Sequence, residues 1–362
     1  MLHAMRLAIR GEGRVEPNPM VGCVIAKKDR IIGQGYHRSF GGPHAEVEAL
    51  RTCTENPRGA WVYVSLEPCR HHGKTPPCTD ALIDAGVARV FIAAKDPNRS
   101  VSGEGAQVLA KAGIAVHEGL CQREGVELIA PFITCLTKKR PFVIAKWAQS
   151  LDGKLATRTG HSQWISCETS RKHVHRTRAR VDAVLVGSGT LLADDPELTA
   201  RDVPLRRRAL RVVLDSRLRI STRHRLVTTA PEFPTLVMTC SEKSNSPKAE
   251  RLRRQGVDVT GCKAQQHRLS LKHCLKLLLD RGVTNILAEG GPTVLTSLFE
   301  QRLVDQAHVF VAPILIGGDK APGPLEGKGP LRVQQALVPQ AMTTRRSGTD
   351  MFYSLRFDSP VE

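Results

Sequence analysis

Residues 41–46 read Gly-Gly-Pro-His-Ala-Glu, and residues 66–78 read Leu-Glu-Pro-Cys-Arg-His-His-Gly-Lys-Thr-Pro-Pro-Cys. Within these two segments, His44, Cys69 and Cys78 offer one nitrogen and two sulfur ligands to a metal ion. Zinc prefers such ligands in a tetrahedral arrangement, and a catalytic zinc site keeps its fourth position open for water. The two segments therefore predict a zinc site with three protein ligands.

Glu46 follows His44 by two residues, at the start of a predicted helix. Zinc lowers the pKa of a bound water, and Glu46 could take a proton from that water and pass it to leaving ammonia. The alternative is a structural zinc knuckle, in which His71 or His72 would supply a fourth ligand. A His-x-Glu segment followed by Pro-Cys is typical of zinc deaminases, so we favour the catalytic interpretation.

Short apolar runs alternate with helix-like segments through the first 120 residues, which predicts a layered α/β domain. The segment 124–136 is predicted to form a connecting helix that ends before Lys138-Lys139-Arg140-Pro141. A second series of alternating strands and helices is predicted after it. Expected strands are 20–26, 30–35, 60–66, 88–94, 141–145, 182–186, 211–215, 235–239, 285–288 and 308–316, which are rich in Val and Ile. Expected helices are 44–53, 78–85, 104–112, 170–181, 248–255, 269–281 and 292–301.

Composition narrows the class of protein. No apolar run reaches the roughly 18 residues of a membrane span, and the first ten residues are too short and mixed for a secretory signal. We therefore expect a cytoplasmic protein with reduced cysteines. The net charge of +18 suggests nucleic-acid binding, but Lys and Arg exceed Asp and Glu by only 3 in residues 1–120 and by 13 in residues 141–362. Most of the excess lies away from the predicted zinc site.

The eight residues between Cys69 and Cys78 are more than the two of the Pro-Cys-x-x-Cys pattern common in deaminases of nucleic acids. The insert, together with residues 17–22 (PNPMVG), 41–46 (GGPHAE) and 95–98 (KDPN), resembles the riboflavin-pathway diaminohydroxyphosphoribosylaminopyrimidine deaminases. The resemblance covers nearly all of residues 15–120. It implies that zinc is bound by His44, Cys69 and Cys78, that Glu46 is the general acid and base, and that the substrate contacts are Asn18, His71, Lys74, Asp96 and Asn98.

The second half resembles the dihydrofolate-reductase-like domain of bifunctional members of the same family. The matching segments are 146–154 (KWAQSLDGK), 160–166 (GHSQWIS), 186–190 (VGSGT), 193–196 (ADDP) and 289–293 (EGGPT). The resemblance implies a site for NADPH formed by Ala148, Trp164, Thr190, Asp194, Ser216, Gly291, Pro292, Thr293, Val294, Leu295, Thr296 and Ser297. It also implies that the sugar phosphate substrate is bound by Ser162, Arg178, Leu198, Arg201 and Glu289.

Chemistry supports several of these roles. Residues 289–293 follow a predicted strand and open a helix, so their backbone amides could bind a cofactor phosphate. Arg178 and Arg201 could each bind the substrate phosphate through a guanidinium fork. Lys146, with Glu289, is expected beside the reacting ribose, where hydride transfer needs a proton donor.

We therefore expect a three-layer cytidine-deaminase-like domain (1–120), a connecting segment (121–140) and a dihydrofolate-reductase-like domain with a mostly parallel sheet (141–362). The expected reactions are deamination of 2,5-diamino-6-ribosylamino-4(3H)-pyrimidinone 5′-phosphate and NADPH-dependent reduction of its ribosyl group to ribityl. A homo-oligomer that binds neither nucleic acid nor membrane is expected. One alternative is an RNA-editing zinc deaminase with a basic RNA-binding C-terminal domain. Another is a zinc-stabilised RNA-binding scaffold without activity.

Overall fold

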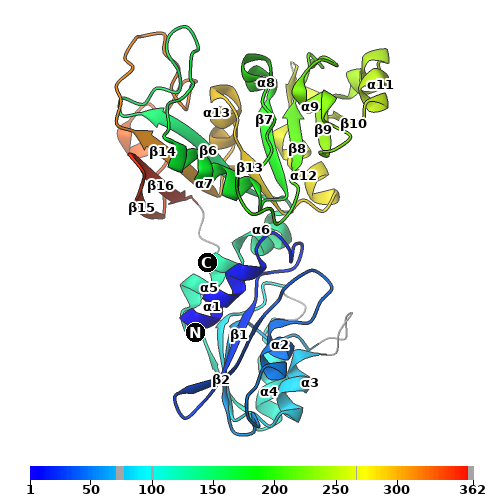
Figure 1. The fold of residues 1–362 in the computed structure, drawn as a ribbon, viewed down its shortest axis with the longest axis vertical. Helices are drawn as coiled ribbons and strands as arrows, with labels where there is room; N and C mark the ends of the chain where they lie inside the picture. The colour runs from blue at the N-terminus through cyan, green and yellow to red at the C-terminus, as the bar shows by residue number, and fades with distance from the viewer. Residues whose placement is uncertain (71–76, 99–101, 266, 358–362) are drawn as a thin grey trace. The chain divides into compact units, whose positions relative to one another are not determined.

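The computed structural model describes residues 1–70, 77–98, 102–265 and 267–357. These residues separate into two compact units, one made of residues 1–139 and the other beginning at Arg140 (Figure 1). No helix in the described ranges combines the length and the apolar character that a bilayer span demands.

The first unit has a five-stranded sheet in the order β2-β1-β3-β4-β5. Its strands are β1 (Gly22–Lys27), β2 (Arg30–Tyr36), β3 (Trp61–Leu66), β4 (Arg89–Ala94) and β5 (Ala115–Glu118). Strand β1 is antiparallel to β2 and β3, whereas β3, β4 and β5 are parallel. Four of these strands match the expected ones, and β5 was missed because only four residues form it and most of them are exposed.

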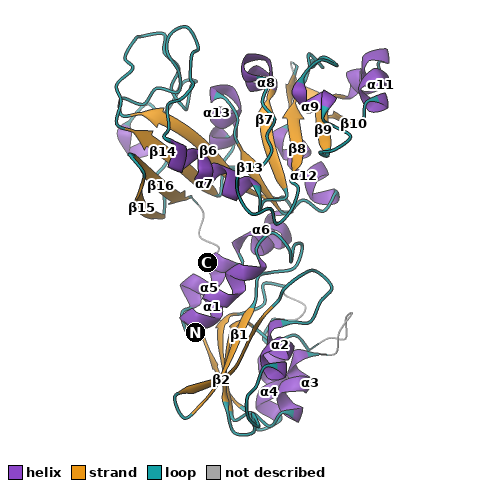
Figure 2. Ribbon diagram, in the orientation of Figure 1, coloured by secondary structure: helices purple, strands orange, loops and turns teal. Residues whose placement is uncertain are grey.

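Helices cover both faces of this sheet, which confirms the predicted three-layer arrangement (Figure 2). Successive strand residues point to opposite faces. Thus Cys23 and Ile25 pack with α2 (Ala45–Arg51), α3 (Cys78–Asp84) and α4 (Glu104–Lys111). Val24 instead contacts α1 (Leu2–Ala8), and α5 (Gln122–Leu128) packs on that same side; α6 (Ala130–Lys138) follows. The segment expected to connect the domains therefore forms two helices within the first compact unit.

The second unit has a nine-stranded sheet in the order β10-β9-β8-β7-β13-β6-β14-β16-β15. The strands from β10 to β14 are mutually parallel, as predicted, and β16 and β15 extend the sheet in antiparallel fashion. The bounds are β6 (Phe142–Ser150), β7 (Ala183–Gly187), β8 (Leu210–Leu214), β9 (Thr235–Cys240), β10 (Val257–Cys262), β13 (Asn285–Ala288), β14 (Gln306–Ala312), β15 (Ala341–Ser347) and β16 (Asp350–Arg356). A separate small hairpin is formed by β11 (Ala264–Gln265) and β12 (Arg268–Leu269).

Two hydrophobic clusters occupy the two faces of the large sheet. In β7, Leu185 packs against α12 (Leu271–Asp280) and α13 (Pro292–Glu300), whereas its neighbours Val184 and Val186 pack on the opposite side. That opposite cluster includes α7 (Glu168–Arg178), α8 (Ser188–Asp194), α9 (Arg225–Thr228) and α11 (Pro247–Arg254); the short α10 (Ser241–Ser244) precedes α11. The central strands are therefore covered on both faces, as their apolar sequences require.

Two expected strand ends were wrong. Strand β6 continues to Ser150 because β14 pairs with it along its length, and β14 ends at Ala312 instead of Ile316. Strands β10, β15 and β16 were not predicted, nor were the two short strands β11 and β12. Of the residues of β15 (Ala341–Ser347), only Ala341 and Met342 are apolar, and β15 lies at the edge of the sheet.

Candidate active sites

Helix α2 brings His44 to the centre of the first site. Strand β2 lets α2 approach closely because it carries glycine where α2 crosses it. A Cβ atom on Gly35 would lie 2.4 Å from the backbone nitrogen of Ala49, and one on Gly33 would lie 2.4 Å from the Ala49 carbonyl oxygen. His44 directly precedes this helix. The close packing therefore sets the depth at which His44 and Glu46 lie.

The three expected zinc ligands converge in the structure. Cys69 follows β3 by three residues, and Cys78 is the first residue of α3. The Nδ1 atom of His44 lies 3.2 Å from the Cys78 sulfur and 3.4 Å from the Cys69 sulfur. One ligand atom from each residue falls within 4.8 Å of the other two, and this is the one such group of three found among the described residues. Their number and chemistry fit zinc with a fourth position left open.

The two thiols differ in acidity. A hydrogen bond from Cys78 and the nearby His44 lower the pKa of Cys69, although burial opposes this shift. The contact with Cys69, together with burial, raises the pKa of Cys78. The cluster thus favours one thiolate even without a metal, and a bound cation would favour both.

Glu46 lies beside these ligands and is almost entirely buried, with 3% of its surface exposed. Burial, reinforced by the charge of Cys69, raises the pKa of Glu46 to about 7. A carboxyl group with a pKa near neutrality can both accept and return a proton, which is what a general acid and base must do.

Two residues near the ligands were not singled out from the sequence. His37 is buried, its Nδ1 lies 2.9 Å from the Pro43 carbonyl oxygen, and its Nε2 lies 3.2 Å from the amide nitrogen of Asn18. Its ring meets that of His44 edge-on, with the centroids 5.5 Å apart. These contacts hold Asn18 close to the predicted metal site. No local sequence pattern had pointed to His37.

Glu67 is the second such residue, and it lies two residues before Cys69. Its carboxylate accepts hydrogen bonds from the backbone amides of Asp96 (3.2 Å), Gly103 (2.9 Å), Gly105 (3.0 Å) and Ala106 (3.2 Å). Glu67 thus joins the segment that carries the metal ligands to the segment that carries Asp96 and Asn98. The Asp96 carboxylate in turn accepts the backbone amide of Asn98 (2.9 Å). His71 and Lys74 lie outside the described residues.

A second buried cluster lies in the second unit. Glu289, directly after β13, accepts two hydrogen bonds from Arg178 of α7: Nε to Oε1 at 2.6 Å and Nη2 to Oε2 at 2.9 Å. Lys146 of β6 places its ammonium 3.8 Å from Glu289 Oε2. Burial alone would raise the pKa of the Glu289 carboxyl. The positive charges of Arg178 and Lys146 have the larger effect and lower this pKa. Burial and the charge of Arg178 lower the pKa of Lys146, despite the nearby Glu289.

Most of the expected cofactor residues gather at the carboxyl ends of adjacent parallel strands, where open α/β sheets bind ligands. Ala148 lies in β6, Thr190 and Asp194 lie in α8 after β7, and Ser216 follows β8. The Thr190 hydroxyl accepts the backbone amide of Gly291 (3.0 Å), which joins the segment after β7 to the turn before α13. Of residues 291–297, Leu295 is fully buried in the core and Thr293 is exposed.

The other expected reductase residues lie in loops. Trp164 is exposed, and the Arg171 guanidinium lies 4.7 Å above its ring. Ser162 is half-buried, and its carbonyl accepts the Ile165 amide (3.2 Å). Leu198 is buried, whereas Arg201 is exposed and contacts Glu197.

Comparison with known proteins connects both sites to one family. Residues 141–352 match the RibD C-terminal domain, and residues 1–94 match the cytidine and deoxycytidylate deaminase zinc-binding region. The chain is 41% identical to the riboflavin biosynthesis protein RibD of Actinobacillus pleuropneumoniae, covering 100% of this chain and 95% of that protein. It is 42% identical to RibD of Aquifex aeolicus, covering 96% of this chain and 95% of the relative.

Solved structures give the same result. A diaminohydroxyphosphoribosylaminopyrimidine deaminase/5-amino-6-(5-phosphoribosylamino)uracil reductase from Thermotoga maritima superimposes with a TM-score of 0.85 at 37% identity, covering 99% of this chain and 97% of that one. RibD from Acinetobacter baumannii also has a TM-score of 0.85, at 34% identity, with 98% and 97% of the two chains covered.

Proposed function

Because this chain belongs to the RibD family of riboflavin biosynthesis proteins, we propose that its two buried clusters are the active sites of a bifunctional deaminase and reductase. The N-terminal unit deaminates 2,5-diamino-6-ribosylamino-4(3H)-pyrimidinone 5′-phosphate, and the C-terminal unit reduces the ribosyl group of the product to ribityl with NADPH. The observation that supports deamination most directly is the convergence of His44, Cys69 and Cys78 beside the buried Glu46. The RNA-editing alternative is set aside because residues 141–352 match the RibD C-terminal domain.

In the deaminase site, His44, Cys69 and Cys78 would hold zinc, which when bound activates water for attack on the pyrimidine. Glu46 takes a proton from the attacking water and delivers it to the amino group as ammonia leaves. Burial raises the pKa of its carboxyl, which suits a group that must return the proton as well as accept it. Asn18, His71, Lys74, Asp96 and Asn98 are proposed to bind the substrate.

In the reductase site, NADPH when bound would supply a hydride for C1 of the opened sugar. Lys146 is the proposed proton donor. Burial lowers its pKa, which makes its ammonium a better acid, and Glu289 keeps that ammonium in place. Arg178 in turn holds the Glu289 carboxylate in a two-point contact. The dinucleotide is proposed to lie along the carboxyl ends of β6, β7, β8 and β13, against Ala148, Trp164, Thr190, Asp194, Ser216 and residues 291–297.

The sugar phosphate is proposed to contact Ser162, Leu198 and Arg201, in addition to Arg178 and Glu289. Arg178 is already paired with Glu289. Arg201 is exposed and thus is the better placed of the two arginines for a phosphate dianion.

We further propose that residues 1–120 form the deaminase domain, 121–140 the connecting segment and 141–362 the reductase domain. The enzyme is proposed to act in the cytoplasm as a homo-oligomer. Leu315, Leu331, Val333 and Val338 support self-association, because each exposes more than 70% of its surface.

A coupled assay tests the bifunctional assignment. Purified protein is given the diaminopyrimidine substrate and NADPH, and ammonia release and NADPH oxidation are followed together. We expect ammonia first and NADPH oxidation after a lag, with no lag when the deaminated intermediate is supplied directly. Ammonia release without NADPH oxidation on either compound would contradict the proposed reductase function.

A further inference from the structure

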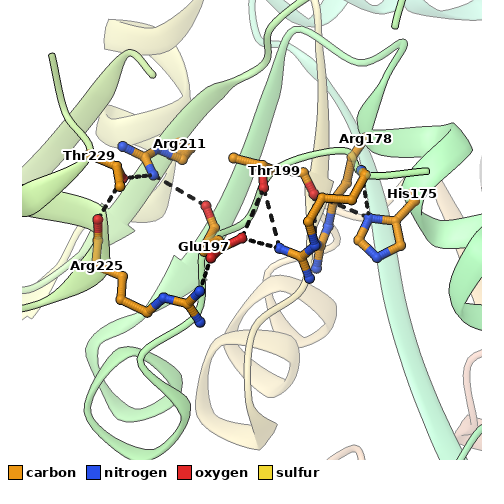
Figure 3. Close-up of polar contacts among 8 residues, drawn as sticks. His175, Arg178, Glu197, Thr199, Arg211, Arg225 and Thr229 are labelled. Carbon is orange, nitrogen blue, oxygen red and sulfur yellow. Dashed lines mark hydrogen bonds and ion pairs between the residues drawn. The ribbon is translucent and has the colours of Figure 1, made fainter. Parts of the chain in front are cut away.

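The loop 195–201, which joins α8 to the segment before β8, is held on two sides in the reductase unit (Figure 3). On one side the Thr199 carbonyl accepts Arg178 Nη1 (3.1 Å) and lies 3.2 Å from His175 Nδ1. On the other side the Glu197 carbonyl accepts Nη1 of the buried Arg211 (3.3 Å). The loop therefore connects the Arg178–Glu289 pair to the arginines around α9.

The Glu197 carboxylate lies between two guanidinium groups. Its Oε2 accepts Arg201 Nη1, and its Oε1 pairs with Arg225 Nη2. Arg225 is also tied to the loop through its backbone amide, which donates to Asp195 Oδ1 (2.9 Å). The side chain of Glu197 is 24% exposed, compared with 48% for Arg201 and 57% for Arg225. Glu197 thus forms an ion pair with each arginine and is the least exposed of the three residues. We call these three residues the Glu197 triad.

This contact restrains one edge of the Arg201 guanidinium. Its Nη1 contacts Glu197 and lies 3.3 Å from the Thr199 hydroxyl, while the backbone amide of Arg201 donates towards His175 Nδ1 (3.2 Å). Its Nε and Nη2 have no hydrogen-bond partner within the part of the chain that the structure describes. These two groups form one side of the planar fork, which matches two oxygens of a phosphate.

We propose that Glu197 is a positioning residue for the phosphate of the reductase substrate, acting through Arg201. By binding Nη1, Glu197 fixes the orientation of the fork and leaves Nε and Nη2 for two oxygens of a phosphate monoester dianion. Because the fork is already oriented, less side-chain entropy is lost when the substrate binds. Arg225 neutralises the carboxylate that would otherwise repel the phosphate. The inference rests on the proposed role of Arg201 and deepens it.

Steady-state reduction by the full-length enzyme tests this role. The substrates are the deaminated ribosylaminopyrimidine phosphate and the same compound without its phosphate, each with saturating NADPH. For Glu197→Gln we expect KM for the phosphorylated substrate to rise roughly fivefold, with kcat within about twofold of wild type. KM for the phosphate-free compound should not change, because a positioning effect on Arg201 matters only where a phosphate is present.

A double-mutant comparison separates Glu197 from Arg201. If Glu197 acts through Arg201, Glu197→Gln should add little to KM in an Arg201→Ala background. Glu250→Gln is the matched control, because the exposed Glu250 pairs with Arg253 of α11 in the same unit. Its KM values should equal those of the wild type. Glu197→Asp keeps the charge with a shorter reach, and it provides a second variant if Glu197→Gln proves unstable; a smaller rise limited to the phosphorylated substrate is expected.

The outcomes distinguish the two levels of the proposal. If Arg201→Ala raises KM and the Glu197 variants do not, the positioning role is wrong while the role of Arg201 stands. A fall in KM for Glu197→Gln would also overturn it, because the carboxylate would then compete with the phosphate. If Arg201→Ala has no effect on either substrate, the proposed phosphate contact itself fails, and the role of Glu197 fails with it.

Discussion

Glu46 is the proposed general acid and base of the deaminase unit. Glu46→Gln preserves the shape of the side chain but cannot accept and return a proton. We expect ammonia release to fall by about 10²–10⁴-fold. Zinc content, measured by metal analysis, and reduction of pre-deaminated substrate should match the wild type. Deamination at the wild-type rate would show that another group moves the proton.

Arg178 has a structural role that its basic helix did not reveal. Its side chain and that of Glu289 are 14% and 9% exposed, so removing the arginine leaves a buried carboxylate whose remaining ion-pair partner among the described residues is Lys146, 3.8 Å away. We expect Arg178→Met to destabilise the reductase unit by about 3–5 kcal/mol, measured by denaturant unfolding. Reduction should fall as well, because the pKa of Glu289 would rise once its largest stabilising charge is gone.

The double variant Arg178→Met/Glu289→Gln is the control for charge burial. It removes both charges and should recover part of the lost stability, without recovering reduction. Equal stability of Arg178→Met and the wild type would mean that the pair contributes little to folding.

At the level of elements, the contact between α2 and β2 decides where His44 lies. A methyl group at Gly35 would meet backbone atoms of α2, including the Ala45 carbonyl oxygen at 2.6 Å, and backbone cannot move aside as a flexible side chain can. We expect Gly35→Ala to displace α2, at a cost of about 1–3 kcal/mol, and to weaken zinc binding. Reductase activity serves as the internal control. Gly59→Ala is the control variant. Gly59 is exposed in the same unit and has a positive φ, but a Cβ atom there would have no neighbour within 4 Å. This variant should retain zinc.

The packing of β14 against α7 and β16 predicts how stability depends on pH. His308 in β14 and His173 in α7 pack around Phe352, with ring centroids 5.3 Å and 4.6 Å from it. Burial, together with the charge of Arg345, lowers the pKa of His308 to about 3 and that of His173 to about 4. Between the pKa values of these histidines in the folded protein and the unfolded value of about 6.5, the unfolded chain binds more protons than the folded chain. The contribution of the two histidines to stability should therefore be complete above about pH 6.5 and decline as the pH falls.

His308→Phe isolates this contribution. The variant should lose less stability than the wild type between pH 7 and pH 5, measured as the denaturant concentration that halves reductase activity. Identical pH dependence in both proteins would assign the acid sensitivity to other groups.

At the scale of the whole molecule, each unit has its own sheet and its own hydrophobic clusters. Chelation of zinc should therefore abolish deamination and lower the melting temperature of the N-terminal unit, while NADPH-dependent reduction continues. Added zinc should restore ammonia release. Parallel loss of both activities on chelation would indicate that the units do not function independently.

The sequence by itself determined the order of the two domains, most of the strands and helices, and the three side chains that converge at the candidate zinc site. His44, Cys69 and Cys78 could be recognised because few residue types bind zinc and because their neighbours form a specific local pattern. Apolar periodicity likewise predicts a strand or a helix from neighbouring residues, since it reflects which side of an element is buried.

Only the tertiary structure decided which distant side chains meet. The Glu67 carboxylate accepts hydrogen bonds from amides 29 to 39 positions ahead, Arg178 meets Glu289 across 111 residues, and Glu197 pairs with Arg225 of α9. Strand order places these groups together, and strand order is absent from local patterns. From the sequence alone, a single Glu or Arg is interpreted as a solvated surface charge. It becomes a positioning group only when burial removes water and a specific partner takes its place.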